Sequence, residues 1–125
     1  MITIKHSGDF RNTERFLNKA QNLRLHSILS SYGKKGVAAL SSATPKDTGI
    51  TASSWDYNIE ITKNGYSIAW FNRHEENGIM PAILIQYGHG TGTGGYVQGM
   101  DYINPAMKPI FDELAEAIWK EVSNL

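Results

Sequence analysis

The chain of 125 residues contains no cysteine. Disulfide crosslinks and thiolate chemistry are therefore excluded, and a zinc site would have to use histidine and carboxylate ligands alone. An excess of charge of one sign is also missing, because twelve lysine and arginine residues balance twelve aspartate and glutamate residues. This balance does not favour nucleic acid or a membrane surface as the main partner.

Long apolar runs are missing as well. No stretch of the sequence approaches the roughly 20 apolar residues that a membrane-spanning helix needs. The residues from Met1 to His6 lack the basic and apolar regions of a secretory signal peptide. We therefore expect a protein that is made and used in a cytoplasm, without association with a membrane.

The length suits a single domain over residues 1–125 with its own apolar core. The alternation from Ile2 to His6 indicates a short strand or an ordered arm. Asp9 or the pair Asn12-Thr13 can cap a first short helix. The main helix is predicted from Leu23 to Ser42, because apolar residues recur there at three- and four-residue spacing.

Two glycines, Gly33 and Gly36, fall inside this main helix. Each costs about 1 kcal/mol relative to alanine in an exposed helix interior, which points to a packing reason. Either another backbone approaches closely at this point, or the helix breaks near Gly33. We expect one long helix and leave a bend near Gly33 open.

The segment from Thr44 to Trp55 is predicted to be a fixed corner between the helical and the sheet part of the chain. Pro45 disfavours helical geometry at the residue before it, so the helix should stop there. Gly49 tolerates a positive φ, and Asp47 and Thr48 can bond their own backbone in a turn.

A sheet is predicted after the corner. Residues 52–62 alternate, with Trp55 at the start of the apolar face, and Asn64-Gly65 is a strong hairpin signal. Residues 66–71 form the returning strand. The apolar run from Ala82 to Tyr87 is predicted to be a third, central strand.

The last third of the chain begins with residues 88–99, which hold six of the twelve glycines. Such a segment buries little, so we expect residues 88–100 to be a mobile loop. Asn104 as N-cap and Pro105 at the first helical position open the closing helix, and Pro109 either restarts or kinks it. Trp55, Trp70 and Trp119 are interpreted as core residues. The predicted class is α+β with two layers, in which a small antiparallel sheet of three to four strands packs on a long N-terminal and a C-terminal helix.

The residue types that carry chemistry do not form a catalytic pattern. The glycine-rich loop follows a predicted strand, but no helix opens at its end, so the phosphate site of a nucleotide-binding fold is missing. His89 is interpreted as a solvated loop histidine, since no nucleophile or orienting partner stands near it in the sequence. His74-Glu75-Glu76 is interpreted as a solvated charged turn and not as a metal site. We predict neither catalytic residues nor a cofactor or metal site.

Three short motifs resemble those of a known family. Residues Ala43 to Gly49, followed by Ala52 to Trp55, resemble the "helix, Pro-x-Asp-Thr-Gly, x-x-Ala-x-Ser" signature of the tail-completion (neck) family of long-tailed bacteriophages. Ile85-Gln86-Tyr87-Gly88 with the glycine loop is similar to that family's aromatic-Gly-Thr strand end, although the family usually has glutamate where this chain has Gln86. Tyr102 to Ala106 resembles the family's Pro-x-x-x-Pro-Ala start of the last helix.

The likeness spans residues 10–122 and implies a non-enzymatic virion protein, of the kind described as minor capsid or minor tail proteins. Such proteins act at the head–tail junction as rings that finish the tail tube or join it to the connector. The implied partners are further copies of the chain and the tail tube, tail terminator or connector proteins. The implied locations are the host cytoplasm during assembly and then the virion neck.

On this interpretation the glycine-rich loop docks during assembly, with Tyr96 and Val97 as anchors, since aromatic residues dominate such contacts. The candidate interface residues are Tyr87, Gly88, His89, Tyr96, Val97 and Met100. The alternative hypothesis is a small enzyme or ligand-binding domain that uses the sheet face near Tyr87, His89 and Tyr96. A deep pocket with His89 at its floor would favour this alternative.

Overall fold

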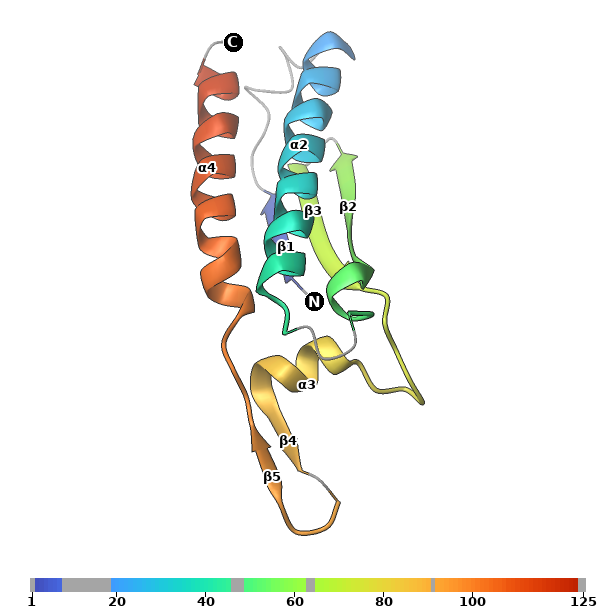
Figure 1. Cartoon of the computed structure of the whole chain (residues 1–125). Coiled ribbons are helices and arrows are strands. Elements are labelled where there is room, and N and C mark those ends of the chain that lie inside the picture. The colour runs from blue at the N-terminus through green and yellow to red at the C-terminus, as the bar shows by residue number, and fades with distance from the viewer. Residues whose placement is uncertain (1, 8–18, 46–48, 63–64, 91, 124–125) are drawn as a thin grey trace.

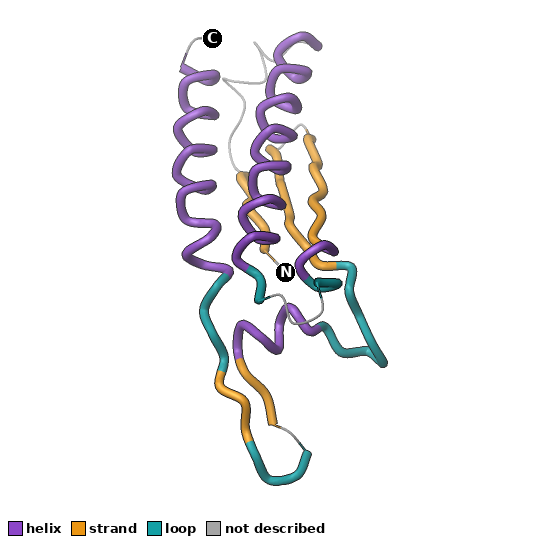
Figure 2. Tube along the Cα trace, in the orientation of Figure 1, coloured by secondary structure: helices purple, strands orange, loops and turns teal. Residues whose placement is uncertain are grey.

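The computed structural model describes residues 2–7, 19–45, 49–62, 65–90 and 92–123. A sheet is covered on one side by the long helix α2 (Lys19–Ala43), and helix α4 (Ile103–Ser123) runs beside α2 (Figures 1 and 2). The α+β class is therefore confirmed. The predicted first helix, with its caps at Asp9 or Asn12-Thr13, lies almost wholly outside the described residues.

The main sheet has the strand order β1-β3-β2, with β1 (Ile2–Ser7) and β2 (Trp55–Thr62) both antiparallel to the central β3 (Gly65–Asn72). The registers set Ile2 and Tyr57 opposite Trp70 from the two sides. The N-terminal segment is thus a strand of the sheet. The two strands of the predicted hairpin are confirmed, because β2 and β3 pair antiparallel. Residue 64 of the predicted Asn64-Gly65 turn lies outside the described part.

The prediction of a central strand from Ala82 to Tyr87 is wrong, because this segment is helix α3 (Pro81–Tyr87). A short apolar run without alternation fits either a strand or a buried helix. Pro81 stands at the first helical position, and Gly88 ends the helix with φ 81°. Both sides of the central strand β3 are already paired with β1 and β2, so this segment is not needed in the sheet.

Helix α2 is continuous through both of its glycines. The Trp70 indole Nε1–H donates to the Gly33 carbonyl at 3.0 Å. A Cβ built on Gly36 would overlap the same indole, and one on Gly33 would overlap the Tyr57 ring. Aromatic side chains of the sheet, and not another backbone, therefore explain these two positions.

The corner after α2 is held by a buried hydroxyl. Thr44, 1% exposed, donates from Oγ1 to the Leu40 carbonyl and accepts the Trp55 indole N–H at 2.8 Å. This contact ties the end of the helix to the start of β2. Helix α2 ends at Ala43 and Gly49 has φ 76°, both as the corner hypothesis requires, whereas residues 46–48 lie outside the described part.

Beyond the corner, residues 52–54 form a 3-10 turn, η1 (Ala52–Ser54), and the strand begins only at Trp55. Helix α4 begins at Ile103, one residue before the predicted N-cap Asn104, and continues through Pro109 without restarting. Trp119 is 70% exposed, so its interpretation as a core residue is wrong. The large core side chains that are almost fully buried come from α2, β3 and α4: Leu29, Leu40, Ile68, Trp70, Met107 and Leu114.

Candidate assembly surface

The glycine-rich segment forms a second, two-stranded sheet that projects from the body of the molecule (Figure 1). Strand β4 (Gly88–Gly90) pairs antiparallel with β5 (Tyr96–Gln98), with His89 opposite Val97. We call residues 87–100 the arm; within it, residue 91 is not described. The sequence predicted a loop here, and the structure corrects this to a hairpin.

The base of the arm is a close approach of two backbone segments. A Cβ on Gly99 would lie 2.6 Å from the Gly88 amide nitrogen, and one on Gly88 would lie 2.6 Å from the Val97 carbonyl oxygen. The Met100 amide donates to the Ile85 carbonyl at 2.8 Å, and the Tyr96 hydroxyl donates to the Tyr87 carbonyl at 3.1 Å. The arm is therefore fixed at its base to the end of α3.

Gln86 joins the arm to helix α4. Its buried side-chain oxygen accepts the backbone N–H groups of Tyr102 and Ile103, each at 3.0 Å. Its amide nitrogen donates to the Asp101 carboxylate at 2.7 Å. These bonds satisfy amides at the start of α4 that have no partner within the helix. The sequence singled out Gln86 only as a departure from the family's glutamate, and its capping role depends on contacts 15 to 17 residues away.

Tyr102 adds a second link between the same two helices. Its hydroxyl donates to the Ala82 carbonyl at 2.7 Å. Burial raises the pKa of Tyr102 to about 12, and the nearby Thr44 side chain opposes part of this shift. The phenol therefore stays neutral at physiological pH and keeps the proton that it donates.

The arm carries half of the exposed large apolar side chains of the described residues. The exposed fractions are 69% for Tyr87, 67% for Tyr96, 47% for Val97 and 51% for Met100. Four such side chains on a thin hairpin are unusual for a surface that meets only water, since extended exposed apolar patches mark interaction sites. Of the predicted interface residues, these four are exposed, and Gly88 shapes the base of the arm.

His89 is half-buried, so its interpretation as a solvated loop histidine is wrong. Its Nδ1 atom is buried and has no hydrogen-bond partner among the described residues. A buried polar atom without a partner costs free energy until something supplies one. This feature belongs to the same arm as the exposed apolar residues.

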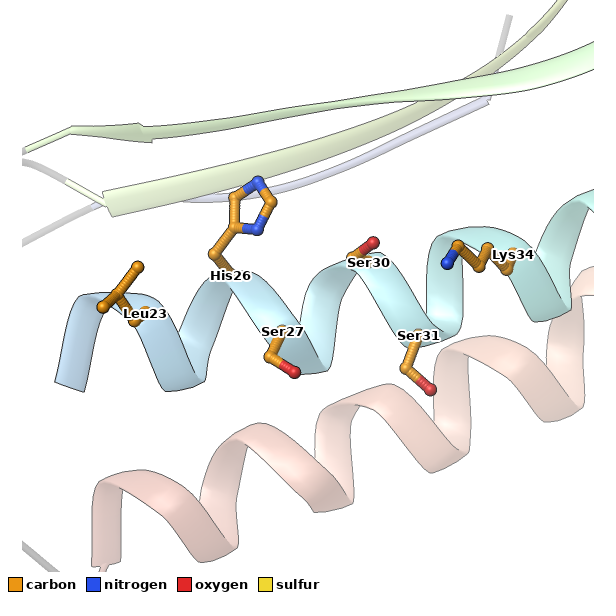
Figure 3. Close-up of a pocket in the computed structure, with 6 residues that line it drawn as sticks. All are labelled: Leu23, His26, Ser27, Ser30, Ser31 and Lys34. Carbon is orange, nitrogen blue, oxygen red and sulfur yellow. The ribbon is translucent and has the colours of Figure 1, made fainter. Parts of the chain in front are cut away.

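Two hollows of the body bear on the alternative of a ligand site. One, of about 560 Å³, lies along α2 between Leu23 and Lys34. Figure 3 shows Ser27 and Ser31 directed toward α4 and His26 toward the sheet. Because its lining comes from one helix and is mostly exposed, this hollow is an open groove. The other is an apolar cavity of about 40 Å³ beside Trp55 and Met80, far smaller than a ligand pocket of roughly 300 Å³. Neither hollow is lined by Tyr87, His89 or Tyr96.

Beside the corner, three side chains form a chain of hydrogen bonds: the Thr51 hydroxyl, the His74 imidazole and the Glu76 carboxylate. Thr51 Oγ1 lies 2.8 Å from His74 Nδ1, and His74 Nε2 lies 3.0 Å from the Glu76 carboxylate. Asn72 joins the network by donating to the Thr51 carbonyl and accepting the His74 amide. The His74 side chain is only 13% exposed, so its interpretation as part of a solvated turn is wrong, while Glu75 and Glu76 are exposed.

The order of atoms resembles a catalytic triad, but the geometry favours a structural role. Thr51 is 5% exposed, and a nucleophile needs access to its substrate. The network instead connects the corner to the loop that leads from β3 to α3. We therefore interpret this hydrogen-bond network as a structural contact that holds the loop in place.

The described residues contain no group of three or more histidine, aspartate or glutamate side chains placed to hold a metal ion. In the same part of the chain, no helix combines the length and the hydropathy that crossing a bilayer requires. Comparison with protein-family models, curated proteins and solved structures finds no match to this chain.

Proposed function

We propose that this chain is a structural protein of the neck of a long-tailed bacteriophage, part of a ring that completes the tail or joins the head to the tail. The observation that carries the proposal is the arm. It is a hairpin fixed at its base that holds Tyr87, Tyr96, Val97 and Met100 out into solvent. Aromatic residues and methionine are enriched at the centres of protein interfaces, and charged residues are depleted there.

The places of the three motifs support the proposal. The first motif begins at Ala43, the last residue of α2. Ile85 to Gly88 joins α3 to the arm, and Tyr102 to Ala106 opens α4. The described residues of the three segments lie at the end of the body from which the arm projects (Figure 1). The second and third segments are linked there by Gln86, which binds the start of α4, and by the hydroxyl of Tyr102, which binds α3. Two of the three motifs that suggest the family thus form the support of the arm.

The alternative, a small enzyme or ligand-binding domain near Tyr87 and His89, gains no support from the groove along α2 or from the cavity beside Trp55, because neither is lined by these residues. The most triad-like group, at Thr51 and His74, is buried at its hydroxyl end. An assembly role needs no enclosed site. It needs a stable body and a surface that is completed by another protein.

The test is assembly of particles that lack the chain, followed by rescue with variants. We expect electron microscopy to show separate heads and tails without it, and joined particles after the unchanged chain is supplied. The double variant Tyr96→Ser with Val97→Ser should fail to rescue, because it removes two anchors of the arm. The matched control Leu23→Ser removes an exposed apolar side chain from the far end of α2 and should rescue. Normal joining without the chain, or full rescue by the arm variant, would contradict the proposal.

A further inference from the structure

The arm belongs to an unusually long part of the chain without charged side chains. Residues 77–100 contain no aspartate, glutamate, lysine or arginine, although 19% of the chain is charged. The stretch covers the turn before α3, α3 itself and the whole arm. A surface of this kind is desolvated at little cost, but it offers nothing to pair with a charged partner. Its partner surface should therefore be apolar and poor in charge as well.

The same chain offers such a surface on its body. Ile79 is 51% exposed and Met80 is half-buried, and both precede α3 within the charge-free stretch. Met80 also lines the apolar cavity of about 40 Å³, so this part of the body has room to adjust to an inserted side chain. The exposed residues Glu75 and Glu76 border this surface, as polar residues usually border an apolar interface.

The positions of these surfaces suit neighbouring copies in a ring. The arm and the loop that carries Ile79 lie at the same end of the molecule and leave α3 on different sides (Figure 1). A ring uses two different surfaces of each copy, and rotation about an axis along the length of the molecule keeps them at the same level. Of the other exposed apolar side chains, Leu23 and Trp119 lie toward the opposite end, in the first turns of α2 and the last turns of α4, where a neighbour's arm at this level does not reach. Ile50 is 52% exposed as well, but it lies just before η1 and outside the charge-free stretch.

We propose that the arm of one copy packs on the surface around Ile79 and Met80 of a second copy of this chain. The inference rests on the proposed ring and names the contact that closes it. Two tyrosines and two aliphatic side chains offer on the order of 500 Å², below the roughly 800 Å² per partner of a stable interface. A single pair of copies therefore associates weakly, and the contact becomes stable when every copy in a closed ring makes it twice.

The absence of cysteine allows a direct test by disulfide trapping. Purified full-length Val97→Cys and Ile79→Cys chains, distinguishable by mass, are mixed in equal amounts at high concentration and oxidised. Both positions are exposed, so neither substitution should disturb folding. We expect mixed dimers in several-fold excess over a control mixture of Val97→Cys with Trp119→Cys. A chain with both Val97→Cys and Ile79→Cys should give a ladder of oligomers that ends at the number of copies in the ring.

Equal yields in the two mixtures would overturn the inference. A predominance of Val97-to-Val97 dimers would overturn it too, because the arms would then meet each other. Trapping can be repeated in assembled particles, where a crosslink from the arm to a tail or connector protein, without one between copies, contradicts this contact and leaves the neck function standing. Particles that join normally without the chain contradict the neck function itself, so the two failures are distinguishable.

Discussion

The body and the arm both depend on glycine, but in opposite ways. In helix α2, Gly33 and Gly36 are buried, and the missing side chains make room for Tyr57 and Trp70 of the sheet. In the arm, glycines shape a narrow hairpin that buries little and leaves its few apolar side chains in solvent. Glycine thus allows two layers to pack closely in one region and removes packing in the other. The body thus gains its stability from its own packing, whereas the arm leaves apolar side chains exposed, and for this reason we propose that the arm contacts another protein.

The largest effect is expected where the helix meets the sheet. Gly36→Val places a branched side chain in the space of the Trp70 indole, and it disturbs the hydrogen bond from that indole to the Gly33 carbonyl. We expect the free energy of unfolding to fall by about 2 to 4 kcal/mol, because overpacking a core and breaking a buried hydrogen bond are both strongly destabilising. Chemical denaturation measures this change.

The matched control is Ala38→Val, an exposed position on the same helix. It should cost only about 0.5 kcal/mol through helix propensity. Similar losses for Gly36→Val and Ala38→Val would mean that the close packing at Gly36 does not stabilise the body.

An intermediate effect is expected at the joint between body and arm. Gln86→Leu keeps the size of the side chain but leaves the amides of Tyr102 and Ile103 without their acceptor. We expect a loss of about 1 to 3 kcal/mol, because unsatisfied buried donors are costly. Hydrogen exchange should show faster exchange of these two amides and of the first turn of α4.

Gln98→Leu, on the exposed strand β5, is the control, and it should leave both measurements unchanged. If Gln86→Leu alters hydrogen exchange no more than Gln98→Leu does, the Gln86 side chain does not connect the arm to helix α4.

The smallest effect on stability is expected in the arm. The double variant Tyr96→Ser with Val97→Ser removes side chains that are already exposed, so the free energy of unfolding should change by less than about 0.5 kcal/mol. The same variant is expected to abolish assembly. A large loss of stability would show that the arm packs on its own body, which contradicts the division between the two regions.

Local pattern predicted much of the body. The apolar spacing gave the main helix to within a few residues of its ends, and the buried positions Leu25, Leu29 and Leu40 lie on the predicted face. The alternation after Trp55 predicted β2 and β3, because an antiparallel sheet with one buried and one solvent-exposed face alternates apolar and polar residues. Pro45 and Gly49 placed the end of the helix. Such signals work because they depend on the backbone and on near neighbours in the chain.

The errors fall where distant parts of the chain decide. Residues 82–87 were predicted to be a strand, but the places beside β3 are taken by β1 and β2. Trp119 was assigned to the core, yet it lies on the exposed side of α4. His74 was expected in solvent and is instead bonded at both ring nitrogens, by Thr51 and Glu76. No spacing in the sequence indicates these contacts.

By itself, then, the sequence determined the class of the fold, the approximate position of its main helix and the chemical character of the arm, since periodicity, turn residues and the absence of charge are local properties. Only the tertiary structure decided that α3 is a helix and that Gln86 caps α4. It also decided that Gly33 and Gly36 face aromatic rings and that the apolar residues of the arm stay outside the core. These outcomes depend on which surfaces remain free after the others have packed, and that competition is settled by contacts between residues far apart in the chain.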